Sequence, residues 1–329
     1  MSSSLPEVYG LSVLIRSKNN TDRCLKTHKI EKYSLRCIEN DTPLLLTTGF
    51  NSYTENKGSL INKGIDFDIS SVNIKNENFS WSTDFNVSHL VSKIDKLDNP
   101  IDYFPWRYEE GKDMYSYYLR EWAGVDVATG RPSWYKNTKK EDGSLDKTIV
   151  FDPNDAEKIL KGKGYADFLG GITNKFQYKN LDLSFLCTFS LGADLYDNSH
   201  NRNSDGTSIG HKNIRQNTKG KHWEKPGDKS EYSRLIYGAP EHGNYNSDRR
   251  LISGDYLKIK NITLGYNLPK HLISKLKLEK VRFYFNATDV YTFYKYKHIN
   301  PEASHSGIVG YSVYFPPLKT YRFGVNINF

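Results

Sequence analysis

Four histidines lie in one polar stretch of the chain, and imidazole is a common ligand of zinc. They are His200, His211, His222 and His242, at successive spacings of eleven, eleven and twenty residues. No two of them have the i, i+4 spacing that places a pair of ligands on one helix face. We therefore predict no metal site from these residues.

Other residues with potential chemistry are just as dispersed. Asp142-Gly143 and Asp205-Gly206 lack the alternating oxygen ligands of a calcium loop, so ordinary turns explain them. Cys24, Cys37 and Cys187 show no C-x-x-C spacing. The sequence has no nucleophile elbow, P-loop or dinucleotide-binding motif. We predict that the chain is not an enzyme and carries no cofactor.

The basic residues are spread along the chain and do not form a stripe. The 329 residues include 46 Lys+Arg and 38 Asp+Glu, a net charge of +8. Adjacent pairs such as Lys139-Lys140 and Arg249-Arg250 stand beside acidic residues. This distribution argues against a nucleic-acid partner, which usually meets a clustered basic face. No run approaches the ~18 apolar residues of a membrane-spanning helix.

The elements that must position any site follow from hydrophobic alternation, which is strictest at the C-terminus. Tyr321, Phe323, Val325, Ile327 and Phe329 alternate with polar residues or glycine up to the last residue of the chain. This period of two predicts a strand with one apolar and one polar face. The apolar face must contact a protein core, or lipid if the strand belongs to a transmembrane barrel.

Several earlier segments show the same pattern. Alternation predicts one hairpin from residue 65 to 88 with its turn at 75–78, and a second from 172 to 191 with its turn at 179–180. Further strands are predicted at 44–48, 115–122, 131–135, 255–267 and 281–288, with a bulge near Asn261. A short helix is expected over 152–160 and an amphipathic turn over 268–276.

The predicted connections alternate in length, which bears on the class of fold. Short ones fall at 75–78, 179–180 and about 268–278, and long ones at 93–113, 136–168, 194–253 and 295–318. Transmembrane barrels sort their loops in this way, with short periplasmic turns and long extracellular loops, whereas a sandwich has no reason to do so. We predict an all-β antiparallel meander of about 9–10 strands.

Residues 1–43 fit poorly with the rest of the chain. They lack sustained alternation, and the first ten residues lack the basic and apolar regions of a secretory signal. We expect an irregular leader over 1–43, or a stretch read from a wrong frame, and a barrel portion over 44–329.

A set of motifs in fixed order resembles the SusC/RagA group of TonB-dependent outer-membrane receptors. The matching segments are 62–65, Phe79-Ser80-Trp81, 121–126 with Thr129-Gly130, 168–171 through 182–185, 223–228, 255–269, Asn300-Pro301-Glu302 and Pro316-Pro317. The resemblance covers roughly 44–329. It implies the C-terminal part of a large transmembrane barrel, without the plug domain and TonB-contacting segment of the family. Family barrels have roughly 22 strands, so alone this polypeptide is expected to aggregate or to form an open curved sheet.

The resemblance also implies a function and partners. Members import large nutrients, usually oligosaccharides or peptides, across the outer membrane, with a SusD-like surface lipoprotein over the mouth and the TonB complex supplying force. Substrate would then meet the long loops, where the rings of Tyr103, Phe104, Trp106, Tyr108 and Trp223 offer flat apolar faces for stacking on sugars. Alternatively these rings pack their own loops or sit in an interfacial girdle.

The terminal aromatic residue has its own implied role. The resemblance makes Phe329 the signal that the outer-membrane assembly machinery recognises, and a lipid-facing girdle position is compatible with that role. The rival hypothesis for the whole chain is a soluble β-rich carbohydrate-binding module. Such a module explains the alternation and the surface aromatics, but not the sorted connections.

Overall fold

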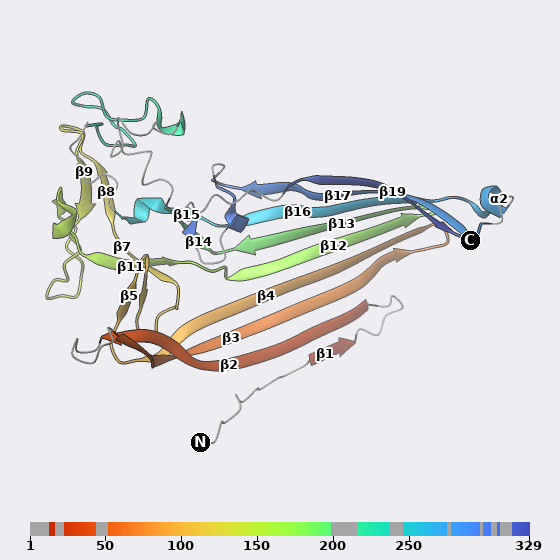
Figure 1. Cartoon of the computed structure of the whole chain (residues 1–329), viewed down its shortest axis with the longest axis horizontal. Coiled ribbons are helices and arrows are strands. Elements are labelled where there is room, and N and C mark those ends of the chain that lie inside the picture. The colour runs from red at the N-terminus through yellow and green to blue at the C-terminus, as the bar shows by residue number, and fades with distance from the viewer. Residues whose placement is uncertain are drawn as a thin grey trace, which may run out of the picture.

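A computed structural model of the chain describes residues 13–16, 23–43, 52–198, 216–236, 246–274, 278–296, 299–303, 308–309 and 318–329. Its main feature is a nine-stranded antiparallel sheet in which each strand pairs with the next sheet strand along the chain (Figure 1). The strands are β1 (Val13–Arg16), β2 (Arg23–Pro43), β3 (Ser52–Lys75), β4 (Phe79–Leu97), β12 (Phe168–Tyr178), β13 (Leu181–Leu191), β16 (Tyr256–Asn267), β17 (Lys280–Tyr294) and β19 (Thr320–Asn328). The sheet is curved and open, with β1 and β19 at its edges.

The predicted sorting of the connections is confirmed. The short connections 76–78, 179–180 and 268–279 lie at one end of the sheet, where the last contains α2 (Lys270–Ile273) (Figure 1). The described parts of the connections 98–167, 192–255 and 295–319 lie at the opposite end. We refer to these as the short-turn end and the long-connection end.

The connection from β4 to β12 is longer than predicted, because the strands expected at 115–122 and 131–135 do not join the main sheet. They exist as β7 (Ser116–Arg120), β8 (Trp122–Val125) and β9 (Pro132–Tyr135), in two small sheets of order β11-β7-β6-β5 and β10-β9-β8. The other members are β5 (Ile101–Tyr103), β6 (Trp106–Tyr108), β10 (Ile149–Val150) and β11 (Lys158–Lys163). A third small sheet contains β14 (Asp194–Asp197), β15 (Leu251–Ser253) and β18 (Ile308–Val309).

Two local expectations turn out differently. The helix predicted over 152–160 is only the 3-10 turn η2 (Pro153–Asp155), capped by the Asp152 side chain, because Lys158–Lys163 pairs with β7. An irregular leader is predicted over 1–43, but the structure has strands at 13–16 and 23–43. There, β1 and β2 extend the main sheet through backbone pairing with each other and with β3, which requires no hydrophobic alternation. The strand predicted at 44–48 lies outside the described residues, which leave out 44–51. This gap begins at the proposed boundary between residues 43 and 44.

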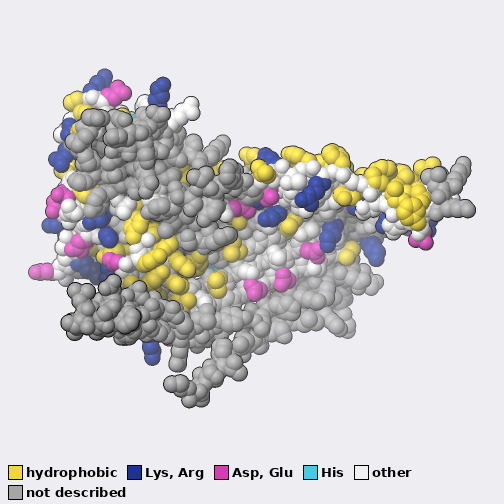
Figure 2. Space-filling view, in the orientation of Figure 1, with side chains coloured by type: hydrophobic (Ala, Val, Ile, Leu, Met, Phe, Trp, Pro, Cys, Tyr) yellow, Lys and Arg dark blue, Asp and Glu magenta, His cyan; other side chains and the backbone are white. Residues whose placement is uncertain are grey.

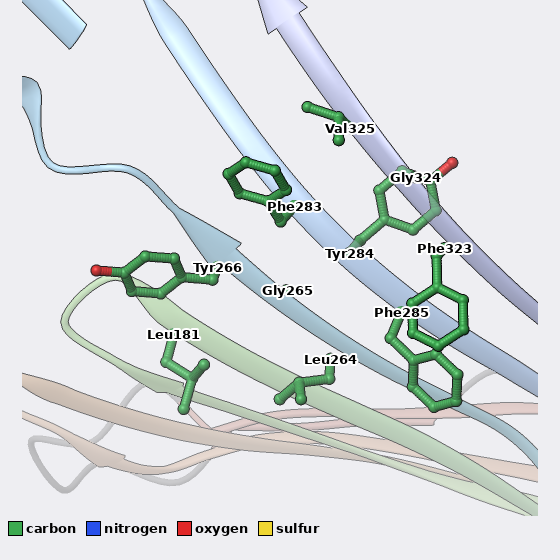
Figure 3. Close-up of a pocket in the computed structure, with 10 residues that line it drawn as sticks. All are labelled: Leu181, Leu264, Gly265, Tyr266, Phe283, Tyr284, Phe285, Phe323, Gly324 and Val325. Atoms are coloured by element: carbon green, nitrogen blue, oxygen red, sulfur yellow. The ribbon is translucent and has the colours of Figure 1, made fainter. Parts of the chain in front are cut away.

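The predicted apolar faces of the strands combine into one surface, the apolar face of the sheet. From β19 to β3, one row of cross-strand partners consists of Phe323, Phe285, Leu264, Leu183, Phe176, Trp81 and Ile74. Phe285 and Phe323 have ring centroids 4.8 Å apart, and Figure 3 shows both beside Leu264. Phe323 is nevertheless 82% exposed, although its ring packs on that of Phe285. Among the described residues no second layer covers this face.

The opposite, polar face carries ion pairs between strands of the sheet. Lys175 lies 2.9 Å from Asp84, and Arg282 binds Asp182 through two bonds of 2.5 and 2.7 Å. Figure 2 shows charged and other polar side chains along the visible face of the sheet, with hydrophobic side chains along its upper rim. One face is therefore suited to an apolar solvent and the other to water.

Gly265 makes the second ion pair possible. It is the cross-strand partner of Asp182, and a Cβ added there would overlap the guanidinium of Arg282. Any larger residue would push Arg282 off the carboxylate. The glycine of this strand is thus required by the side chain that lies across it.

We expect Gly265→Ala to destabilise the folded protein by about 1 kcal/mol, because it disrupts a partly exposed charge-assisted pair. Guanidinium unfolding monitored by gel mobility measures this loss. If the mechanism is correct, the same substitution has much less effect in an Arg282→Met background. Additive losses would show that the guanidinium is not involved.

The predicted bulge near Asn261 is confirmed by register shifts on both sides of β16. The shift towards β17 lies between Ile259 and Asn261, and that towards β13 lies between Leu186 and Cys187.

None of the described helices is long and apolar enough to cross a bilayer.

Candidate functional site

The best exposed of the predicted binding aromatics lies on the β5–β6 hairpin. Tyr103 is 61% exposed, and its ring stacks on Trp106 at 6.0 Å and on Tyr108 at 6.4 Å. Phe104 follows at the tip, 41% exposed, with an edge-to-face contact to Tyr196 at 5.6 Å. The hairpin therefore presents two adjacent aromatic rings on a fixed support.

The other two aromatic residues of this hairpin provide that support. Trp106 is only 5% exposed and belongs to a buried cluster with Tyr117, Leu119 and Tyr196. Tyr108 packs between this cluster and a second one at the end of β4. In this structure, these two predicted stacking residues pack within their own connection.

Charged side chains surround the hairpin. Arg107 lies 3.4 Å from Asp102 and 3.3 Å from Glu109, and its guanidinium stands 4.5 Å above the ring of Tyr118. Aromatic rings with hydrogen-bonding neighbours can hold a polar ligand that also has apolar faces. Among the described residues no group of three or more His, Cys, Asp or Glu side chains could hold a metal ion.

Trp223, from the connection between β13 and β16, packs on a turn 93 residues away in the sequence. Its ring lies directly over Gly130, and its Nε1 donates to the Val127 carbonyl at 3.1 Å. The amide of Gly227 donates to the same carbonyl at 2.8 Å. Trp223 thus holds residues 216–236 against the β8–β9 turn, and its ring is used for packing.

His222 is the one histidine of the predicted stretch that the structure describes. Its Nδ1 donates to the Ser233 carbonyl at 3.0 Å, and its ring lies 5.2 Å from that of Tyr232. Nε2 is buried, with no hydrogen-bond partner among the described residues. Burial lowers the pKa of His222 and the positive charge of Arg249 acts in the same direction, which together outweigh the opposing effect of the hydrogen bond to Ser233. His200, His211 and His242 lie outside the described residues.

We expect the packing of residues 216–236 to weaken as the pH falls below about 6.5, the ordinary pKa of histidine. An unfolded His222 takes up a proton there, whereas the folded one resists it, so the free energy of unfolding decreases as the pH falls. Limited proteolysis of this segment should be faster at pH 5 than at pH 8. His222→Phe should remove most of the difference, and an unchanged pH dependence in that variant would assign it to other groups.

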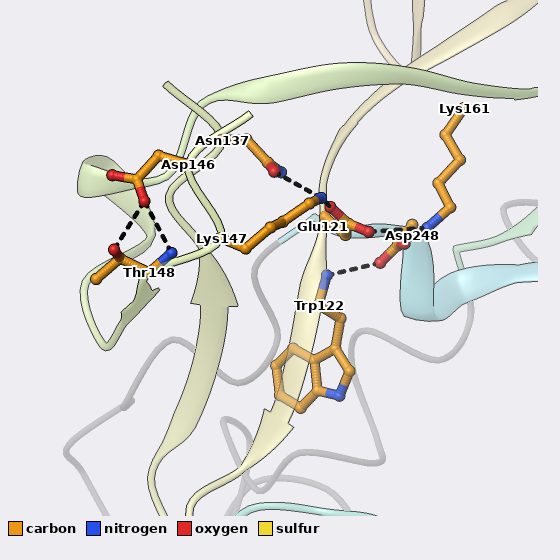
Figure 4. A network of polar contacts seen from close by, with 8 residues as sticks. All are labelled: Glu121, Trp122, Asn137, Asp146, Lys147, Thr148, Lys161 and Asp248. Carbon is orange, nitrogen blue, oxygen red and sulfur yellow. Dashed lines mark hydrogen bonds and ion pairs between the residues drawn. The ribbon is translucent and has the colours of Figure 1, made fainter. Parts of the chain in front are cut away.

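A polar network that the sequence did not predict joins the two small sheets (Figure 4). Glu121 forms ion pairs with Lys147 and, at 3.5 Å, with Lys161. Lys161 also lies 2.6 Å from Asp248, which accepts a hydrogen bond from the Trp122 amide at 2.8 Å. Burial by itself would raise the pKa of Glu121, but its lysine partners lower it overall. The network fixes β8 against β11 and residues 248–250.

Comparisons with known proteins agree on one group. The TonB-dependent receptor P3 of Formosa agariphila is 28% identical over 87% of this chain and 30% of its own length. The TonB-dependent receptor SusC of Bacteroides thetaiotaomicron is 26% identical over 88% of the chain and 28% of its own length. A solved structure titled as that of the RagAB peptide transporter matches with a TM-score of 0.77, at 19% identity, over 98% of this chain and 38% of the other.

The chain is related to the SusC/RagA-type TonB-dependent receptors. No family model matches it. The chain spans about a third or less of the length of the curated relatives it matches, with 35% for receptor P39 of Formosa agariphila as the largest share among them. The likeness to the solved structure shows the fold, an antiparallel barrel wall.

Two motifs of this receptor segment meet in the Trp223 contact. Thr129-Gly130 ends the first motif, in which Asp126 caps the turn by accepting from the Thr129 amide at 3.0 Å. Trp223 begins the second, in which Asp228 closes the turn by accepting from the Lys225 amide at 3.0 Å. The sequence contains both motifs, but a contact between segments so far apart in the chain could not be predicted from it.

A third motif of the receptor segment anchors a long connection to the sheet. Lys258 of β16 is 3% exposed and forms ion pairs with Asp289 at 2.7 Å and with Glu302. Glu302 belongs to Asn300-Pro301-Glu302 and lies in η6 (Pro301–Ala303). The buried Lys258 therefore holds the β17–β19 connection against β16 and β17.

Phe329 follows β19 and is 87% exposed at the short-turn end (Figure 1). Its place at an exposed end beside an edge strand is compatible with the predicted assembly signal. That role remains a prediction.

Proposed function

We propose that this chain forms part of the barrel wall and the extracellular loops of an outer-membrane, TonB-dependent importer of large nutrients such as oligosaccharides or peptides. The observation that carries the proposal is the uncovered apolar row from β19 to β3, opposite a face of ion pairs. Hydrocarbon on one side and water on the other satisfy both faces at once.

Substrate contact falls to the loops at the long-connection end. Of the predicted stacking residues, Tyr103 and Phe104 have exposed rings there, whereas Trp106 and Trp223 are used in packing. A ring backed by other rings loses little conformational freedom when a ligand stacks on it. Both sugar rings and peptide side chains have flat or apolar faces that fit such a support.

The partners proposed with this function are a SusD-like surface lipoprotein and the TonB complex. The lipoprotein would meet the long-connection end, where the small sheets project beyond the main sheet (Figure 1). The TonB complex would act on the intact receptor from the periplasmic side. Outer-membrane lipid is the partner of the apolar face.

Uptake by the receptor that carries this segment tests the role of the hairpin. We expect Tyr103→Ala to reduce uptake of the receptor's nutrient several-fold, because it removes the exposed stacking surface. The matched control is Phe151→Ala, which removes an exposed ring 37% accessible on another loop. Equal uptake by the two variants would remove Tyr103 from the site.

Fractionation tests the membrane assignment separately. The receptor should enter the outer-membrane fraction, require detergent for extraction and change gel mobility on heating. Clean solubility in plain buffer would instead favour the soluble carbohydrate-binding module.

A further inference from the structure

An apolar groove of about 380 Å³ crosses the apolar face near the short-turn end (Figure 3). One side is formed by Leu181, Tyr266, Phe283 and Val325, and the other by Leu264, Phe285 and Phe323. Gly265, Tyr284 and Gly324 alternate with these along the strands, so their backbone lines the floor.

The shape and lining of the groove suit a hydrocarbon chain. Its sides consist of aliphatic and aromatic groups, and several of them remain substantially exposed, such as Phe283 at 46% and Tyr266 at 41%. Strands of transmembrane barrels tilt by about 35–45°, so a groove across them is also inclined to the membrane plane. A lipid tail can therefore follow it from the membrane surface inwards.

Exposed cations lie at the end of the sheet nearest the groove. Lys179 lies in the β12–β13 turn next to the strand that begins with Leu181, and its Nζ lies 5.6 Å from the ring centre of Tyr178, an apolar-face residue. Lys270 is exposed in α2, beside Leu272, which is 52% exposed. In the described parts of these two turns, Glu279 is the one acidic residue.

We propose that the groove and these lysines together seat an anionic glycerophospholipid of the leaflet at the short-turn end. One acyl chain occupies the groove, and the headgroup phosphate lies between Lys179 and Lys270. The proposal rests on the membrane orientation given above. Each lysine close to an anionic lipid surface strengthens binding by roughly fivefold, so we expect at least a tenfold preference for anionic over zwitterionic lipid.

Tryptophan quenching by brominated acyl chains tests this in the intact receptor. Phe283→Trp places the probe in the groove, and Phe168→Trp places it on the same face at the long-connection end, where Phe168 is 45% exposed. Both probes are made in a Trp81→Phe background to silence the tryptophan of the apolar face. The receptor is reconstituted into vesicles of brominated phosphatidylglycerol or brominated phosphatidylcholine, mixed with unbrominated phosphatidylcholine.

At Phe283→Trp, brominated phosphatidylglycerol should quench at about tenfold lower mole fraction than brominated phosphatidylcholine, and at Phe168→Trp the two lipids should be equal. Adding Lys179→Gln and Lys270→Gln should abolish the preference. Quenching of the Phe168→Trp probe in that variant shows that it is still inserted. Equal quenching by both lipids at both probes overturns the phospholipid seat but leaves the proposed function intact. No quenching at either probe overturns the proposed function as well.

Discussion

Ile172→Arg should destabilise the folded receptor by about 2–4 kcal/mol, the cost of a cation on the lipid face near the middle of a transmembrane barrel. Ile172 lies near the centre of β12, with Phe85 and Cys187 as its cross-strand partners on the apolar face. Among the described residues, the positions next to Ile172 on that face carry no carboxylate. Guanidinium unfolding of the receptor in lipid vesicles, read by heat-modifiable mobility, measures the loss.

The matched control is the neighbouring residue. Thr173 points to the polar face, where its partner on β4 is Asp84. Thr173→Arg adds the same charge to the same strand in a hydrated setting beside a carboxylate, so its effect should stay within about 1 kcal/mol. If the two variants lose equal stability, the apolar face does not contact hydrocarbon, and the membrane assignment fails.

Gly130→Ala should release residues 216–236 from the β8–β9 turn, at a cost of about 3 kcal/mol. Gly130 has a φ of +72°, where an alanine is strained by about 1–2 kcal/mol, and the added methyl group would overlap the ring of Trp223. Overpacking of this kind adds about 1–3 kcal/mol. Limited proteolysis of residues 216–236 and the Trp223 fluorescence report the release.

The control substitution Gly143→Ala separates the backbone strain from the overlap with the Trp223 ring. Gly143 also has a positive φ, +80°, but no atom lies within 4 Å of an added Cβ. Gly143→Ala therefore carries the backbone strain alone, and we expect about 1–2 kcal/mol with no change in the proteolysis of residues 216–236. If Gly130→Ala behaves in the same way, the Trp223 contact does not hold the segment.

The sequence predicted the main sheet because the apolar face imposes a strict rule on each strand. Phe323, Phe285 and Leu264 must all be apolar when the whole face meets one solvent, so alternation alone locates their strands. Connection lengths then separated a barrel wall from a sandwich. The bulge near Asn261 was predictable because it shifts this alternation by one residue.

The strands of the small sheets, and β1 and β2 of the main sheet, follow no such rule. β7 and β8 alternate like wall strands, but Tyr117 and Leu119 pack into a local aromatic cluster, which a sequence pattern cannot distinguish from a wall. β2 pairs along β3 through backbone groups that every residue carries, so its side-chain sequence gave no signal. At the candidate site, Trp106 and Trp223 were correctly placed in loops, but only three-dimensional contacts show which aromatic rings are left exposed.

The β4–β12 connection starts and ends at neighbouring strands, so its sequence can vary among such receptors without changing the sheet. β4 and β12 are direct neighbours, paired from Phe79 and Tyr178 at one end to His89 and Phe168 at the other. Residues 98–167 form their own small sheets between these two points. We expect this insert to vary between homologues together with residues 216–236 and 248–250, which it contacts, so that recognition diversifies while the main sheet stays fixed.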